Sequence, residues 1–389
     1  MKAGDVVGGY TLLKDFSVVG AGLSEWTFAR RDGHDYFLKR FLSPTYPDDD
    51  APGSPLTKQR KRARCAVFES HHRAIKAALA PVTRYGGNLV ATLDFFRSGA
   101  KYYKVTEKID VAGLSAADIA RLDLPTKMVL LKTATHSLKI LHDLGIVHSD
   151  LKPDNLLVKR TDRGYTTKLI DFDSSYLVGS PPPPEEIVGT MNYYSPALVR
   201  YIQGDGPAGD LTPAGDIFAL GLIFCEYLTG SLPAFDPTQH EAAIAVLNGA
   251  VLSMPAAELP APLVDLVQRM LLAKRPSRPN VGDVHATLLG LGNGTTVARK
   301  PRPPQPAPSA PSSLRGKGLR LAGPGQAQPP TDSAGAPDIP PASTATSPER
   351  SPAAVAPAGA SEATAPAVPA GAAGKLVGKL LHRIDRRLR

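Results

Sequence analysis

The chain has 389 residues and a formal net charge of +9 at neutral pH, a length that allows roughly two or three domains. Its two cysteines, Cys65 and Cys225, exclude a disulfide-stapled secreted scaffold. No apolar run approaches the roughly 18 residues of a membrane-spanning helix, and the first residues lack the apolar stretch of a signal peptide. We therefore expect a cytoplasmic protein.

A strand, a glycine pair and a second strand are predicted near the start of the chain. Residues 10–19 alternate apolar and polar side chains, as a half-buried strand does. Gly20 and Gly22 follow, and glycines let a backbone approach phosphate oxygens with its N–H groups pointing inward. The next strand, Tyr36–Lys39, carries a single lysine. By itself the glycine pair is weak evidence, because most such pairs are plain turns.

An irregular insert containing Pro and Gly follows this strand and ends in a basic run, residues 58–64. We expect the run to begin a helix that carries Glu69, the only acidic residue between Asp50 and Asp94. The run offers positive charge to nucleic acid or acidic partners. A solvated helix face is the simpler interpretation, so no specific nucleic-acid partner is predicted. A solvated position is likewise the alternative to a functional role for Glu69.

Two later segments carry the groups that phosphoryl transfer needs. Asp150, Lys152 and Asn155 lie close together in sequence, and Asp171 follows 21 residues after Asp150. The reaction requires a base for the attacking hydroxyl, a cation near the γ-phosphate, and carboxylate and amide oxygens for Mg²⁺. Asp150 would be the base, Lys152 the cation, and Asn155 and Asp171 the metal ligands.

The order of these segments resembles that of the eukaryotic-type (Hanks-type) Ser/Thr protein kinases. Lys101–Ile109 is similar to the strand that enters the hinge, and Gly189–Ala197 to the end of the activation segment. Asp216–Gly221 resembles the helix that braces the catalytic loop, and Arg278 falls at the position of the closing arginine. High Ala, Pro and Arg usage hints at a bacterial member of the family.

The resemblance implies an α+β, bilobal protein-kinase fold. A small β-rich lobe and hinge would occupy residues 1–109, and a large, mainly helical lobe residues 110–293. ATP and Mg²⁺ are the implied cofactors, and Lys152 with Thr190 follows the pattern of Ser/Thr-directed members. The implied nucleotide-binding residues are Gly20, Gly22, Lys39, Glu69, Thr106, Glu107 and Ile109.

Each nucleotide-binding residue has a role in the family pattern. Lys39 would orient the α- and β-phosphates, with Glu69 as its ion-pair partner on the following helix. Thr106 would guard the back of the adenine pocket, and the backbone of Glu107 and Ile109 would meet the adenine edge. An ordinary half-buried strand remains the alternative for this stretch.

Three departures from the pattern concern regulation and the phosphate loop. Ser149 replaces the arginine that receives an activation-segment phosphate. Asp173 replaces the glycine of the magnesium loop, which should restrict that loop and could place a further carboxylate near the metals. Glu25 replaces the third loop glycine, and we expect it to point to solvent because a carboxylate near phosphates is unfavourable.

A fourth departure concerns the large lobe. Ala197 replaces a glutamate and would leave Arg278 without its ion-pair partner. Losing one side of a buried pair costs about 3–5 kcal/mol unless another group compensates. Glu185 or Glu186 is the predicted substitute.

The last hundred residues differ in composition from the rest. Residues 294–374 are rich in Pro, Ala, Gly and Ser and contain no aromatic residue, which predicts a disordered linker. Residues 375–389 place apolar residues at helical spacing among Lys and Arg. This basic amphipathic helix would dock on a partner protein or on the chain itself, with an anionic membrane surface as the alternative.

We therefore expect a Ser/Thr protein kinase that transfers the γ-phosphate of Mg-ATP to protein substrates, itself included, in signalling. The alternative is a nucleotide-binding pseudokinase that acts as a scaffold or docking module. The presence of Lys39, Asp150, Asn155 and Asp171 favours the active enzyme, because pseudokinases usually lack at least one of the corresponding groups.

Overall fold

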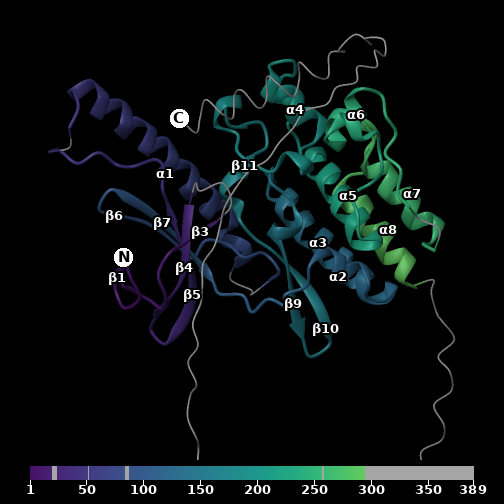
Figure 1. The fold of residues 1–389 in the computed structure, drawn as a ribbon, viewed down its shortest axis with the longest axis horizontal. Coiled ribbons are helices and arrows are strands. Elements are labelled where there is room, and N and C mark those ends of the chain that lie inside the picture. The colour runs from purple at the N-terminus through teal and green to yellow at the C-terminus, as the bar shows by residue number, and fades with distance from the viewer. Residues whose placement is uncertain (20–23, 51, 84–86, 256–257, 294–389) are drawn as a thin grey trace, which may run out of the picture. The chain divides into compact units, whose positions relative to one another are not determined.

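The computed structural model describes residues 1–19, 24–50, 52–83, 87–255 and 258–293 (Figure 1). Three sequence predictions concern residues outside these ranges. They are the glycine pair Gly20 and Gly22, the linker 294–374 and the amphipathic helix 375–389, and all of them stay predictions.

An antiparallel sheet forms the first part of the described chain. Its strand order among the described residues is β1-β2-β4-β5-β7-β6, and β3 pairs with β4. The strands are β1 (Val6–Val7), β2 (Tyr10–Leu12), β3 (Ser17–Val19), β4 (Ser24–Arg31), β5 (His34–Phe41), β6 (Asp94–Ser98) and β7 (Lys101–Glu107). The strand predicted over residues 10–19 is thus two strands. Lys14 lies in the bend between β2 and β3. Its carbonyl accepts a hydrogen bond of 2.6 Å from the hydroxyl of Thr27 on β4.

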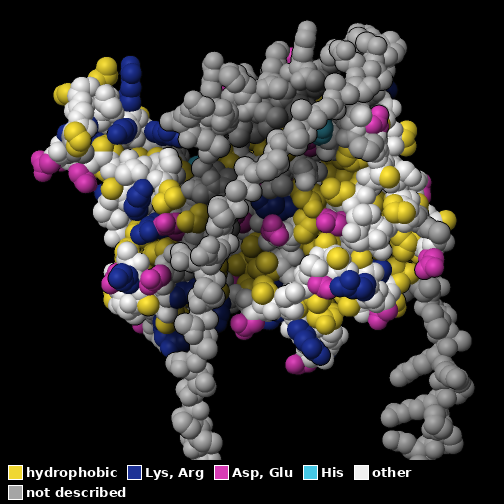
Figure 2. Space-filling model, viewed as in Figure 1, with side chains coloured by type: hydrophobic (Ala, Val, Ile, Leu, Met, Phe, Trp, Pro, Cys, Tyr) yellow, Lys and Arg dark blue, Asp and Glu magenta, His cyan; other side chains and the backbone are white. Residues whose placement is uncertain are grey.

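Helix α1 (Pro55–Thr83) packs on this sheet through an aromatic cluster. Cys65 on α1 is buried against Phe41 of β5 and Tyr102 of β7. The basic run, residues 58–64, lies within α1, and most of its side chains are exposed. Figure 2 shows Lys and Arg side chains along this helix. The run is therefore part of a solvated helix face.

The second part of the described chain is mainly helical. Its elements are α2 (Ala116–Ala120), α3 (Leu124–Asp143), β8 (Ile146–Val147), β9 (Leu156–Thr161), β10 (Gly164–Leu169), β11 (Tyr176–Leu177), α4 (Pro196–Gln203), α5 (Ala214–Thr229), α6 (Ala242–Leu247), α7 (Ala261–Met270) and α8 (Val281–Asn293). Every residue from Asp216 to Cys225 in α5 is buried, so this helix forms the centre of the core. The predicted α+β, bilobal class is confirmed, while the lobe boundaries stay predictions.

A short parallel bridge ties the chain that leaves α1 to the end of β10. The Val90 amide donates to the Leu169 carbonyl at 2.9 Å, and the Leu169 amide donates to the Asn88 carbonyl at 2.8 Å. The two parts of the fold are thereby joined two residues before Asp171. None of the helices in the described ranges combines the length and apolar character needed to cross a membrane.

Among the described residues no acidic side chain pairs with Arg278, and backbone carbonyls bind it instead. Its guanidinium donates to the carbonyls of Leu272 at 2.7 Å, Ala214 at 2.8 Å and Ala273 at 3.0 Å. It also lies 5.0 Å from the ring centroid of Phe218. The predicted substitution by Glu185 or Glu186 is wrong, because three main-chain oxygens already accept from the buried cation.

Replacing Arg278 with Ala should destabilise the protein by about 3 kcal/mol, because hydrogen bonds to a charged donor are worth about 1.5–3 kcal/mol each and the carbonyls would lose their donor. Urea unfolding of the full chain measures the change. Arg269→Ala is the matched control, because Arg269 makes an exposed pair with Asp265 and should cost under about 1 kcal/mol. Equal losses in the two variants would contradict the anchoring role.

Candidate active site

A buried carboxylate on α5 holds the loop that carries the candidate catalytic groups. Asp216 is 2% exposed. It accepts hydrogen bonds from the backbone amides of His148 at 2.8 Å and Ser149 at 2.9 Å, and from His142 Nε2 at 2.9 Å. Ser149 has φ of +70°, in the left-handed region that a serine seldom adopts. Two charge-assisted bonds to adjacent amides hold this conformation in place.

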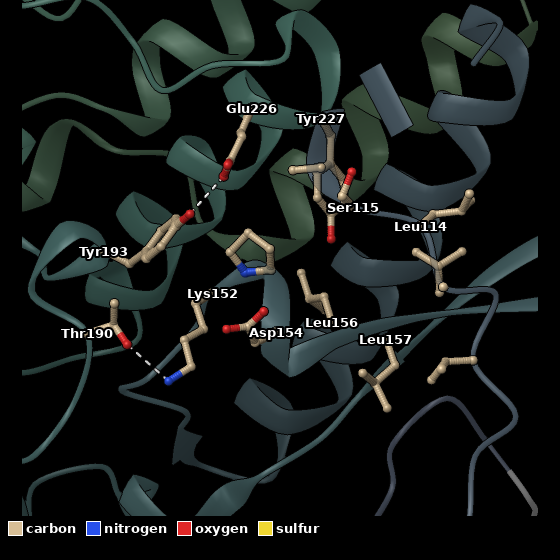
Figure 3. Close-up of a pocket in the computed structure, with 15 residues that line it drawn as sticks. Leu114, Ser115, Lys152, Asp154, Leu156, Leu157, Thr190, Tyr193, Glu226 and Tyr227 are labelled. Atoms are coloured by element: carbon tan, nitrogen blue, oxygen red, sulfur yellow. Dashed lines mark hydrogen bonds between the residues drawn. The ribbon is translucent and has the colours of Figure 1, made fainter. Parts of the chain in front are cut away.

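The predicted base, cation and amide side chain meet in this loop. Lys152 Nζ lies 3.0 Å from Asp150 Oδ2, and Asn155 Nδ2 donates to the Asp150 carbonyl at 2.7 Å and to Oδ2 at 3.2 Å. Thr190 closes the group, since its amide donates to Asp150 Oδ1 at 3.2 Å and its hydroxyl oxygen lies 3.0 Å from Lys152 Nζ (Figure 3). A threonine hydroxyl thus already lies beside the cation that the sequence assigned to phosphoryl transfer.

Gly189 has a steric reason to be glycine. A Cβ at this position would lie 3.0 Å from Asp150 Oδ1 and 2.8 Å from Tyr194 Cε1. Because contacts this short force neighbouring atoms to shift, a side chain here would displace either the carboxylate or the ring. The bare backbone lets the segment pass close to Asp150.

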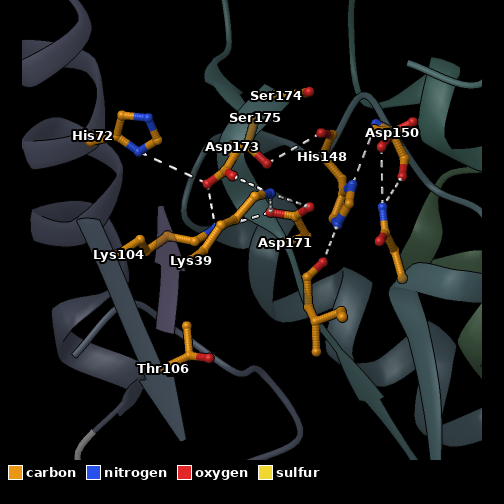
Figure 4. A network of polar contacts seen from close by, with 12 residues as sticks. Lys39, His72, Lys104, Thr106, His148, Asp150, Asp171, Asp173, Ser174 and Ser175 are labelled. Carbon is orange, nitrogen blue, oxygen red and sulfur yellow. Dashed lines mark hydrogen bonds and ion pairs between the residues drawn. The ribbon is translucent and has the colours of Figure 1, made fainter. Parts of the chain in front are cut away.

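The loop that carries Asp171 is joined to the catalytic loop through His148. The His148 ring donates from Nε2 to the Ile170 carbonyl at 3.0 Å and packs 5.4 Å from the ring of Phe172. Asp171 itself has φ of +60°. The backbone turns sharply at this residue and directs its carboxylate toward the sheet (Figure 4).

Two lysines from neighbouring strands meet two carboxylates in front of the sheet (Figure 4). Lys39 on β5 and Lys104 on β7 are directly opposite each other in the strand register. Lys39 Nζ lies 3.1 Å from Asp171 and 2.7 Å from Asp173. Lys104 Nζ lies 2.9 Å from Asp171 and also pairs with Asp173. The cluster therefore contains two positive and two negative groups.

The predicted ion pair between Lys39 and Glu69 does not occur in the structure. The Glu69 carboxylate accepts instead from the Tyr102 hydroxyl at 2.7 Å and from Arg73 at 2.9 Å. Its place beside Lys39 is taken by Asp173, which stands where the family pattern has glycine. The sequence could not show this, because the choice depends on which distant carboxylate reaches the lysine in the folded chain.

Opposite charges beside Lys39 and Asp173 set the pKa of each of these two groups. Burial by itself lowers the pKa of Lys39, but the carboxylates of Asp173 and Asp171 outweigh it and keep the pKa above its usual range. Burial raises the pKa of the Asp173 carboxyl, yet Lys104 and Lys39 hold it well below its usual range. At neutral pH both groups are charged.

Lys104 is a candidate functional residue that the sequence reasoning missed. It is only 4% exposed, and a buried lysine requires a compensating negative charge. The available signal was a lysine between the apolar Tyr103 and Val105 in a predicted strand. Its position opposite Lys39 became visible only with the register of β5 and β7.

The structure also corrects the prediction for Glu25. Its carboxylate does not point to solvent but pairs with the Arg40 guanidinium across β4 and β5. Both side chains are largely buried, with 20% and 19% of their surface exposed. The arginine opposite Glu25 in the strand register supplies a counter-ion that makes this position favourable.

The predicted hinge residues lie at and just beyond the end of β7. Thr106 is half-buried and donates from its hydroxyl to the Glu107 carbonyl at 3.3 Å. Figure 4 shows Thr106 on the same strand as Lys104 and apart from the charged cluster. Ile109 is half-buried and lies past the strand end. Their contacts with adenine stay predictions.

A pocket of about 430 Å³ opens beside the catalytic loop (Figure 3). Lys152 and Thr190 lie on one side of it, and Leu114 and Leu157 lie on another. Because Lys152 also contacts Asp150, a chain segment seated in this pocket would approach the candidate base. The pocket thus provides access to the catalytic loop.

The carboxylate oxygens of Asp171 and the amide oxygen of Asn155 are of the type that Mg²⁺ takes as ligands. Within the described ranges, no group of three or more His, Cys, Asp or Glu side chains is arranged to hold a metal ion. Mg²⁺ keeps several waters and takes one or two protein oxygens together with phosphates. The Asp171 carboxylate and the Asn155 amide oxygen match this need, because the hydrogen bonds of Asn155 given above use its nitrogen.

Two histidines of α1 face the same cluster. His71 Nε2 donates to the Asp173 carbonyl at 3.2 Å, and His72 Nδ1 lies 3.9 Å from Asp173 Oδ1. The His72 ring stacks on Phe95 at 4.6 Å. Burial lowers the pKa of His72 to about 4, so this ring is neutral at physiological pH.

The buried His72 should make stability depend on pH. Its folded pKa lies below the unfolded value, so the unfolded chain binds more protons and stability falls as the pH drops from about 6.5 toward 4. Between pH 7 and pH 5 this residue should account for about 2 kcal/mol of lost unfolding free energy. Urea unfolding of the wild type and of His72→Phe at pH 7 and pH 5 measures the contribution of His72 to this loss.

The exposed His34 provides the control for this measurement. His34→Gln should keep the wild-type difference between pH 7 and pH 5, whereas His72→Phe should show a smaller one. A difference that is the same in all three proteins would rule out His72 as the source.

Comparison with known proteins adds independent information about this site. The protein kinase domain pattern matches residues 78–288, a range that contains Asp150, Lys152, Asn155 and Asp171, while Lys39 lies before it. The chain is 30% identical over 230 residues to the serine/threonine-protein kinase drp72 of Corynebacterium efficiens, covering 52% of this chain and 42% of that protein.

Two further relatives are bacterial serine/threonine-protein kinases. PknA of Corynebacterium glutamicum is 32% identical over 206 residues, or 51% of this chain and 40% of PknA. Pkn1 of Myxococcus xanthus is 34% identical over 155 residues, or 38% of this chain and 21% of Pkn1. The chain thus spans less than half the length of these relatives. The matched domain and the fold together show that the chain belongs to the protein kinase family.

Proposed function

We propose that this chain is an active Ser/Thr protein kinase that transfers the γ-phosphate of Mg-ATP to hydroxyl groups of proteins. The observation that carries the proposal is the group formed by Asp150, Lys152, Asn155 and Thr190. In this group the Lys152 ammonium lies within hydrogen-bond distance of both the Asp150 carboxylate and the Thr190 hydroxyl. Serine/threonine-protein kinases among the relatives support the same acceptor class.

The acceptor side of the reaction follows from this geometry. Asp150 is positioned to accept the proton of a substrate hydroxyl, as Lys152 and Asn155 hold its carboxylate in one orientation. Lys152 would neutralise charge on the phosphoryl group in transfer. Thr190 makes the contact with Lys152 that a substrate hydroxyl would make. An acceptor serine or threonine would therefore displace Thr190 from Lys152.

The nucleotide side uses the charged cluster. Lys39 would orient the α- and β-phosphates, and Asn155 and Asp171 would hold Mg²⁺, which supplies charge neutralisation on the phosphates when bound. The ion pairs that Lys39 and Asp171 make with each other would then be exchanged for contacts with phosphate and metal. The backbone near Gly20 and Gly22 would cover the phosphates, and that near Glu107 and Ile109 would bind adenine.

We further propose that the kinase phosphorylates other proteins and also itself. Residues 375–389 would bind a docking partner or an anionic membrane surface. Residues 294–374 contain serines and threonines, which we propose as acceptors for autophosphorylation. Mapping of phosphorylated residues in protein produced beside an Asp150→Asn control tests this proposal. Identical maps would exclude autophosphorylation.

The central test is transfer of labelled γ-phosphate from Mg-ATP to the protein and to generic Ser/Thr acceptors. Asp150→Asn and Lys39→Met should each lower the rate by about 100-fold or more, because base and phosphate positioning are lost. Asp162→Asn, an exposed residue in the turn between β9 and β10, is the matched control and should keep the wild-type rate. Binding of Mg-ATP by folded wild-type protein without transfer would favour the scaffold alternative.

Gly189→Ala should lower kcat by about tenfold or more, because a Cβ would push against the Asp150 carboxylate. The control is Gly209→Ala, since a Cβ at Gly209 meets no atom within 4 Å. Steady-state phosphorylation of a generic acceptor measures both variants. A wild-type kcat in Gly189→Ala would show that the chain around Gly189 can shift without moving the Asp150 carboxylate.

A further inference from the structure

We propose that Asp173 is the positioning residue for Lys39, in the role that the family pattern gives to a glutamate on the following helix. Lys104 shares the same counter-ion and forms a second cation at the nucleotide phosphates. This inference rests on the proposed function for its consequences in catalysis. Its structural basis is the pair of contacts that Asp173 makes with Lys39 and Lys104.

The geometry around Lys39 assigns this role to Asp173. Among the described residues, the carboxylates within ion-pair distance of Lys39 belong to Asp171 and Asp173. Asp173 is the closer, at 2.7 Å against 3.1 Å. Because Asp171 is needed for Mg²⁺ in the proposed function, Asp173 is the carboxylate that can stay on Lys39 when metal and nucleotide bind.

The helix glutamate is engaged elsewhere. Glu69 accepts from the Tyr102 hydroxyl, and Tyr102 is fully buried in the cluster between α1 and the sheet. Releasing Glu69 toward Lys39 would leave that buried hydroxyl without its acceptor, which is costly. Helix α1 approaches the cluster instead through His71 and His72, which face Asp173.

The second lysine explains why the extra carboxylate is present. Lys39 and Lys104 are cross-strand neighbours, with 16% and 5% of their side chains exposed. Like charges directly opposite each other on a sheet are destabilising. A single aspartate would leave this half-buried site with a net positive charge. Asp173 restores neutrality, and when Asp171 turns to a metal it keeps both lysines in place for phosphate.

The reactivity of Lys39 toward acetic anhydride in the nucleotide-free protein tests the proposal without any catalysis. Asp173→Asn should lower the pKa of Lys39 and speed its acetylation by about tenfold or more, because loss of a contacting carboxylate shifts a pKa by about one unit or more. Glu69→Gln, the matched variant, should leave the rate within about twofold. The exposed Lys274 is the internal reference, and mass spectrometry quantifies both sites.

Steady-state kinetics gives the second readout. At saturating Mg-ATP, Asp173→Asn should lower kcat by about tenfold or more with a smaller change in KM for ATP, because the phosphates bind but are misplaced. Asp173→Glu should recover part of the rate, since it keeps the charge. Glu69→Gln should retain the wild-type kcat. The proposal would be overturned if Glu69→Gln, and not Asp173→Asn, sped the acetylation of Lys39 and lowered kcat.

The two proposals fail in different ways. A wild type that transfers no phosphate would refute the proposed function, and the acetylation rates would still decide the role of Asp173. Unchanged Lys39 acetylation in folded Asp173→Asn would refute the role of Asp173 alone. If Asp173→Asn does not fold, the Lys104→Met/Asp173→Asn double variant keeps the charges balanced and is compared with Lys104→Met. Equal Lys39 acetylation in these two would likewise refute the proposal.

Discussion

The neutral cluster of Lys39, Lys104, Asp171 and Asp173 is the constraint on which the rest of the site depends. It joins two strands of the sheet to the loop that follows β10, across sequence separations of 67 to 134 residues. Breaking a buried charge pair by removing one partner costs about 3–5 kcal/mol, so none of these elements can settle independently. The backbone bridge at Leu169 and the hydrogen bond from His148 to Ile170 then fix the position of the catalytic loop relative to this cluster.

The catalytic loop could be predicted from sequence because its chemistry is local. Asp150, Lys152 and Asn155 lie close together in sequence, so a single loop carries all three side chains. Asp216 was predicted as the brace of this loop, and its bonds to two loop amides agree. The fold class followed from the resemblance, because the segments occur in the order of the protein-kinase family pattern.

The counter-ions could not be predicted, because each depends on distant parts of the chain. Glu69 was chosen by its isolation in sequence, yet Tyr102 and Arg73 bind it. Glu25 needed the strand register to reveal Arg40 across the sheet. Lys104 was hidden among apolar neighbours. In all three cases the sequence shows which charges exist, and only the packing of the sheet decides how they are paired.

The anchoring of Arg278 bears on how this family member can vary over evolutionary time. A partner side chain can be lost by a single codon change, whereas a carbonyl oxygen is present whatever residue stands there. Since Arg278 is held by three carbonyls, position 197 no longer has to preserve an acidic group. Substitutions at position 197 therefore need not remove a partner of Arg278. The end of the activation segment can change in sequence while the anchoring of Arg278 is kept.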